Sequence, residues 1–104
     1  INSITGSIVA DASLFGNEMV PPSWSWQNMG NYFGAGPRGL TIEDNSYAVY
    51  FNTDNKVGDT ATLLSVSPTI PNLILESHVT GDSVNYDNSN IFGAPYCNRR
   101  VIRG

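Results

Sequence analysis

Short runs of apolar and β-branched residues alternate with polar turn sequences along most of this chain. Runs of this length, bounded by Gly, Pro, Asn, Asp and Ser, are typical of β-strands joined by turns. They predict strands at residues 4–9, 40–42, 47–51, 60–66 and 73–79. A weaker strand is predicted at 83–86, and short runs at 91–92 and 100–102 are expected to close the sheet.

Residues 11–39 break this pattern, with three prolines and five glycines. A connection this long in a small domain is usually functional, unless it contains strands that the pattern hides. A helix at 11–19, in which Asp11 caps a stripe that includes Leu14 and Phe15, is the alternative.

The recurring strands and turns indicate an all-β fold, an antiparallel β-sandwich or a jelly-roll-like barrel with a long N-terminal irregular segment. The 104 residues fit a single β domain, residues 1–104. Because the chain starts at Ile1 and not at Met, we expect it to be excised or processed from a longer chain.

Low charge is the unusual feature of the composition. Charged residues make up 13% of the chain, against about 25% in typical domains, and the net charge is −4. This balance argues against nucleic-acid binding, which depends on Lys and Arg. Arg99, Arg100 and Arg103 cluster near the end and could contact an anion, but the interpretation we favour is a solvated C-terminal strand. No run is long enough for membrane insertion, so none is expected.

The segment 21–34 carries the most informative side chains. In an extended chain Trp24 and Trp26 would point to one face, because side-chain direction alternates. Two indoles side by side can stack on the apolar face of a sugar ring. Alternatively, both tryptophans fill the core or a subunit interface.

Neutral polar neighbours complete this predicted ligand-binding site. Gln27 and Asn31 can hydrogen-bond sugar hydroxyls without carrying charge. Tyr32, Arg38 and Tyr86 are expected at its rim.

Catalytic and metal-binding signals are weak. The carboxylates are scattered over predicted turns, so no acid–base pair can be assigned, and calcium in a loop is only an alternative. His78 and Cys97 are single residues of their kinds and lack a recognisable nucleophile motif. We therefore expect no enzyme activity, no catalytic residue, no metal and no cofactor.

These observations together predict a lectin-like, non-catalytic carbohydrate-binding domain. By analogy of composition we expect it in an extracellular or virion protein such as a phage tail fibre or tailspike, acting in host-cell attachment. The expected partners are a cell-surface glycan and further copies of the chain in a homotrimer. A structural trimerisation or capping domain of a fibre is the first alternative, and a small glycan hydrolase is the second.

Overall fold

Five strands and three short 3-10 helices make up the regular structure of the residues described below. The computed structural model describes residues 2–16, 18–53 and 56–104. The strands are β1 (Ala48–Asn52), β2 (Thr62–Ser67), β3 (Ile74–His78), β4 (Asn90–Phe92) and β5 (Arg99–Arg103). The 3-10 helices are η1 (Trp26–Asn28), η2 (Tyr32–Gly34) and η3 (Glu43–Asn45).

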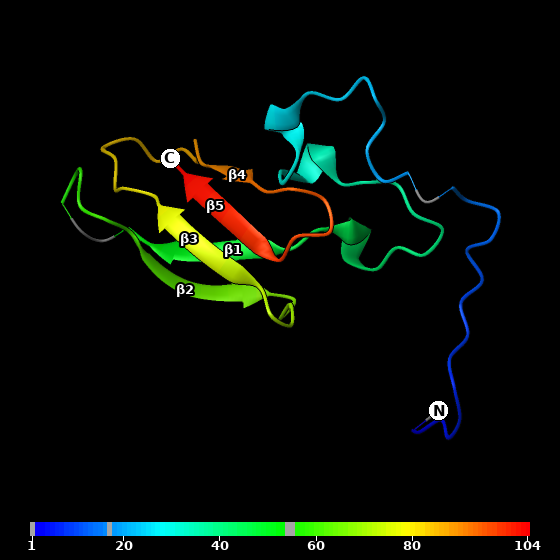
Figure 1. The fold of residues 1–104 in the computed structure, drawn as a ribbon. Helices are drawn as coiled ribbons and strands as arrows, with labels where there is room; N and C mark the ends of the chain where they lie inside the picture. Colours follow the sequence, from blue (N-terminus) through cyan, green and yellow to red (C-terminus); the bar gives the residue numbers. More distant parts are fainter. Residues whose placement is uncertain (1, 17, 54–55) are drawn as a thin grey trace.

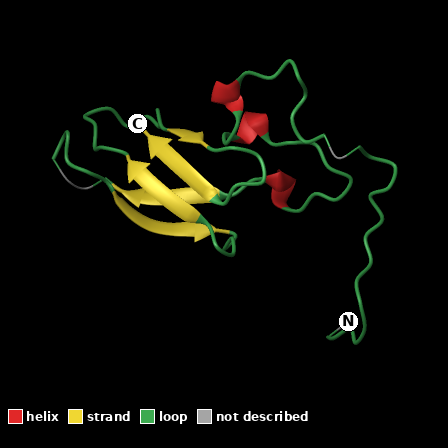
Figure 2. Ribbon diagram, in the orientation of Figure 1, coloured by secondary structure: helices red, strands yellow, loops and turns green. Residues whose placement is uncertain are grey.

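The strands form two small sheets. β1 pairs with β2 in an antiparallel sheet, with an irregularity in register between Tyr50 and Phe51. The second sheet has the order β3-β5-β4, in which β3 and β5 are parallel and β4 and β5 are antiparallel. A bridge between Thr60 and Thr80 joins the chain just before β2 to the chain just after β3. All five strands therefore gather at one end of the molecule, beside the 3-10 helices (Figures 1 and 2).

A small apolar cluster holds the two sheets together. Ile102 of β5 is fully buried, and Ala61 and Val79 are the other buried members. Val49 and Phe51 of β1 pack against this cluster as partly buried side chains. Because side chains alternate along a strand, these residues bring the inner face of β1 onto the inner face of the three-stranded sheet.

The irregular N-terminal segment, which precedes β1, lies beside β4 and forms no strand in its described residues. Asn31 Oδ1 accepts a hydrogen bond from the Ile91 N–H at 3.1 Å, which occupies part of the outer edge of β4. Gly30 has a φ of +100°, and a Cβ there would meet the Ile91 carbonyl carbon at 2.9 Å. Only glycine allows this close approach, so residues 30–31 fix the irregular segment to the sheet.

The sequence correctly predicts a β-rich protein with a long irregular segment. Strands occur near the predicted positions 47–51, 60–66, 73–79, 91–92 and 100–102. The alternative helix at 11–19 is not formed in its described residues.

Three predicted strands are wrong, each for a local reason. Residues 4–9 extend away from the body without a strand partner among the described residues (Figure 1), and Ile8 is 93% exposed. Residues 40–42 lead directly into a left-handed turn at Glu43, Asp44 and Asn45, which have φ values of 51°, 52° and 57°. At 83–86 the Asp82 carboxylate accepts the Ser83 N–H and thereby offers the backbone an alternative to a strand ladder.

The expectation of a purely antiparallel fold is also corrected. β3 and β5 are parallel because the chain between them passes through β4 before it returns beside β3. Strand pairing between residues so far apart leaves no signal in local periodicity.

Candidate functional site

A hollow of about 1110 Å³ lies between β1, β4, β5 and the irregular N-terminal half. Its apolar lining includes Val49 and Phe51 of β1 and Ile91 of β4. Among its described lining residues, Arg100 and Asp87 are the only charged side chains. An apolar concavity with a few polar groups is the usual form of a ligand site, so we take this hollow as the candidate functional site.

Arg100 is placed in the hollow by the geometry of β5. Side chains alternate along the strand, so Arg100 and Ile102 share the inner face, and Arg99 and Arg103 lie on the outer one. Arg100 Nη1 donates to the carbonyls of Arg99 at 3.0 Å, Ala94 at 3.4 Å and Cys97. These bonds anchor the guanidinium through its Nη1 nitrogen.

Gly93 gives the Arg100 side chain its room. A Cβ at position 93 would lie 2.7 Å from both Nε and Nη1 of Arg100. Any larger residue would therefore force the guanidinium to move.

Tyr47, immediately before β1, supplies a second polar group to the same hollow. Its hydroxyl is buried close to Arg100. Burial raises the pKa of the Tyr47 phenol, and the positive charge of Arg100 and its hydrogen bonding to the phenol partly offset this effect. The phenol therefore stays protonated and keeps an O–H donor.

Asp87, the acidic lining residue, is engaged in its own turn. It accepts hydrogen bonds from the Ser89 hydroxyl at 2.6 Å and from the Ser89 N–H at 2.9 Å. These bonds from Ser89 lower the pKa of Asp87. The Asp87 carboxylate is thus partly satisfied by donors in its own turn. Arg100, by contrast, is bonded to uncharged carbonyl oxygens, which do not neutralise its positive charge.

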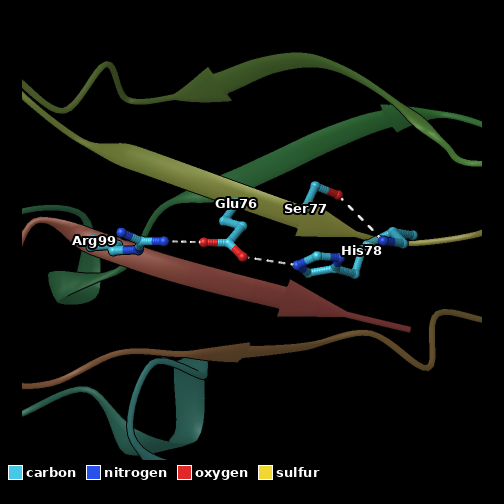
Figure 3. Close-up of polar contacts among 5 residues, drawn as sticks. Glu76, Ser77, His78 and Arg99 are labelled. Atoms are coloured by element: carbon cyan, nitrogen blue, oxygen red, sulfur yellow. Dashed lines mark hydrogen bonds and ion pairs between the residues drawn. The ribbon is translucent and has the colours of Figure 1, made fainter.

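A separate polar row crosses the outer face of the three-stranded sheet (Figure 3). Glu76 Oε1 lies 3.0 Å from His78 Nε2, and Glu76 Oε2 accepts a charge-assisted bond from Arg99. The bond to His78 and then the bond and charge of Arg99 lower the pKa of Glu76. All three side chains are well exposed, so this row resembles a solvated ion network more than a reaction centre.

Ser77, between Glu76 and His78, does not form a hydrolytic triad with them. Neighbouring strand residues point to opposite faces, and the Ser77 hydroxyl instead accepts the Val79 N–H at 3.4 Å (Figure 3). The hydroxyls of Ser46, Ser83 and Ser89 bond to oxygens no more than three residues away. These serines act as turn caps in the described structure.

The structure separates the predicted ligand-binding residues into groups. Trp24 lies in a turn closed by the bond from its N–H to the Pro21 carbonyl, and Trp26 begins η1. The segment is therefore not extended, and the argument for two indoles on one face does not hold. Trp24 is half-buried, and Trp26 is 59% exposed beside an exposed Gln27.

Three of the predicted residues, Asn31, Tyr32 and Tyr86, do line the hollow. Arg38 lies in a smaller neighbouring hollow, and its guanidinium carbon is 5.3 Å from the centre of the Tyr96 ring. Contact between these residues and a ligand stays a prediction.

Sequence reasoning missed Tyr47 and singled out Arg100 only as one of three arginines. The signal for Arg100 was available, because alternation along a strand separates it from Arg99 and Arg103. Tyr47 gave no such signal, since its burial depends on contacts with distant residues.

Two further observations concern the part of the chain that the structure describes. It brings together no three His, Cys, Asp or Glu side chains that could hold a metal ion. It also has no helix with the length and apolar character needed to cross a bilayer.

Comparison with known families gives a match over the whole chain. A model described as the D-Ala-D-Ala carboxypeptidase 3 (S13) family matches residues 1–104. This match contradicts the predicted function as a carbohydrate-binding domain of a tail fibre or tailspike, and with it the alternatives of a fibre cap and a glycan hydrolase. The prediction that the protein is not an enzyme is also wrong, since the match indicates a peptidase.

The error has a physical origin. Low charge and abundant Asn, Ser and Thr describe a β-rich surface, and such a surface is shared by proteins of unrelated function. The expected homotrimer and glycan partner stay predictions.

Proposed function

The chain belongs to the D-Ala-D-Ala carboxypeptidase 3 (S13) family, and from this membership we propose that the protein removes the terminal D-alanine from peptides that end in D-Ala-D-Ala. The observation that carries the proposal is the family match, which covers every residue of the chain. The reaction is hydrolysis of the last peptide bond, with water supplying the new carboxyl oxygen.

Such a reaction requires two tasks of the protein. One is attack on the terminal peptide bond, and the other is recognition of a short peptide with small methyl side chains and a free carboxylate. The described residues support the second task. The hollow combines an apolar lining with the positive charge of Arg100 and the O–H group of Tyr47.

The nucleophile is not assigned to the hollow. Penicillin-binding proteins carry their nucleophile in a Ser-x-x-Lys motif and use a Lys-Thr-Gly motif beside it. Lys56, the one lysine of this chain, follows Thr53 at that spacing and precedes Val57, so it fits neither motif. We propose that the residues lining the hollow serve the peptidase by binding substrate.

Two further proposals follow the expectations from sequence. We propose that the two sheets act as the layers of a small sandwich, which the apolar cluster around Ile102 supports. We also propose an extracellular location, because peptides that end in D-Ala-D-Ala belong to the bacterial cell wall.

The first experiment measures release of D-alanine by the full-length protein. The substrate is an N-acylated tripeptide that ends in D-Ala-D-Ala, and the matched control ends in L-Ala-L-Ala. We expect free D-alanine from the first peptide and no alanine from the second. A protein that is folded by circular dichroism and releases no D-alanine would contradict the proposal.

A further inference from the structure

We propose that residues 4–9, named here the arm, bind as an added β-strand along the open edge of β1 in a second copy of this chain. Figure 1 shows the arm leaving the body of the molecule at the N-terminal end. The second copy then completes the wall of the hollow beside β1. This inference is independent of the proposed reaction, because it rests on strand pairing alone.

The arm has the composition of a strand but pairs with no described strand. Its β-branched residues are Ile4, Thr5, Ile8 and Val9, and residues 2–10 contain neither a charge nor a proline. Ile4, Ile8 and Val9 are 75%, 93% and 89% exposed, so nothing in the described structure covers them. An uncharged, β-branched segment with unpaired backbone groups is suited to pairing with an open sheet edge.

A turn anchors the base of the arm and directs it away from its own sheets. The Phe15 N–H donates to the Ala12 carbonyl at 3.0 Å, and the Ser13 N–H donates to Asp11 Oδ1 at 2.9 Å. A Cβ at Gly39 would lie 2.7 Å from both Ala12 Cβ and Phe15 Cδ2, so this turn packs directly on the backbone at position 39. With its base fixed there, the arm points away from β1 of its own chain (Figure 1).

β1 lies at the end of the strand series where another strand can be added. The Ala61 N–H, just before β2, donates to the Val79 carbonyl, just after β3, at 2.9 Å. The strands can therefore be followed in the order β4-β5-β3-β2-β1, with β4 and β1 at the two ends. Asn31 occupies part of the outer edge of β4. Along the other edge of β1, by contrast, no described strand pairs with it.

The arm and this edge are complementary in charge, pattern and length. β1 contains neither a charge nor a proline, the features that usually protect an open edge. In an extended arm Ile4 and Ile8 share one face, which matches Val49 and Phe51, the apolar β1 side chains that line the hollow. The arm would span about 20 Å and β1 about 17 Å. Because every copy carries both an arm and an edge, exchange of arms satisfies both in a closed assembly.

The first test is the molar mass of the full-length protein, measured by light scattering on a sizing column over a range of concentrations. We expect a dimer or a closed trimer that dissociates on dilution. Ile4→Ser combined with Ile8→Ser removes the apolar face of the arm, and Tyr50→Lys places a charge on the β1 edge. We expect each of these two proteins to associate about tenfold or more weakly. Val84→Ser is the matched control, because Val84 is also exposed but lies outside both surfaces, and we expect it to leave association unchanged.

Cross-linking then identifies the surfaces in contact. All proteins carry Cys97→Ser, which removes the free thiol of this chain. One protein has Ser7→Cys in the arm, and the other has Tyr50→Cys in β1. We expect the mixture to form a disulfide between the two proteins under mild oxidation. In the control mixture Val84→Cys replaces Tyr50→Cys, and we expect no such disulfide.

The contrary outcomes are distinct from those of the activity assay. A protein that is monomeric at every concentration measured overturns the proposal, as does an oligomer that the arm and edge variants leave unchanged. A disulfide that closes within a single chain carrying both cysteines, while the mixture stays unlinked, also overturns it, because the arm then pairs with its own β1. Release of D-alanine is not measured in either experiment, so failure of the proposed reaction leaves these outcomes unaffected.

Discussion

At the scale of single residues, position on a strand decides what each charged side chain does. Arg99 and Arg100 are neighbours in sequence, yet one pairs with Glu76 in solvent and the other lies half-buried in the hollow. The sequence could identify the arginine cluster, and strand alternation predicts the division between the faces. It could not predict that Tyr47 lies beside Arg100, because that contact depends on how β1 and β5 come together.

The first prediction at this scale concerns the pKa of Glu76. Its bonds to His78 and Arg99 hold the pKa below the ordinary value of 4.5. The unfolded chain therefore binds more protons than the folded one as pH falls toward the lowered pKa, and the stabilising effect is lost through that window. An NMR titration of the Glu76 carboxyl should give a midpoint below 4.5 in the wild-type protein and a higher one in His78→Ala. A wild-type midpoint at or above 4.5 would show that the contacts seen in Figure 3 do not form in solution.

At the scale of elements, strands form where neighbours are present to complete their hydrogen bonds. The runs at 47–51 and 73–79 become strands because β2 and β5 lie beside them. Residues 4–9 have equally favourable composition and remain unpaired by any described strand. Local pattern thus predicts the capacity to form a strand, and the rest of the fold decides whether that capacity is used.

Asn31 tests how the irregular half is fixed to β4. Asn31→Ala removes the acceptor of the Ile91 N–H, and an unpaired, partly buried N–H costs about 1–3 kcal/mol. We expect a loss of that order in the free energy of unfolding by urea and faster hydrogen exchange at Ile91. Asn31→Asp keeps an acceptor oxygen and should retain most of the protection. Equal exchange rates at Ile91 in Asn31→Ala and the wild type would exclude this role.

Ile102 tests the contact between the two sheets. It is the one fully buried side chain of the described residues, and truncation of such a residue to Ala typically costs about 2–5 kcal/mol. Ile74 on the adjacent strand β3 is 59% exposed and provides the matched control. Urea unfolding should therefore show a much larger loss for Ile102→Ala than for Ile74→Ala. Similar losses in the two variants would mean that the sheets do not meet through Ile102.

At the scale of the whole molecule, the chain is flat and extended. Its radius of gyration is 16.9 Å, against roughly 13 Å for a compact domain of this length. The N-terminal segment, which extends away from the body, contributes to the difference (Figure 1). Composition was a reliable guide to the β-rich fold at this scale, but it was misleading about function, as the family match shows.

The measurement that tests the central claim most directly is a competition between two substrates. Equal amounts of N-acylated peptides that end in D-Ala-D-Ala and L-Ala-L-Ala are incubated together with the full-length protein, and mass spectrometry follows the loss of one alanine from each. Membership of the S13 family predicts that only the D-Ala-D-Ala peptide is shortened, with the other left intact as an internal standard. If both peptides stay intact, or if the L-Ala-L-Ala peptide is shortened as fast, the assignment of D-Ala-D-Ala carboxypeptidase activity is contradicted.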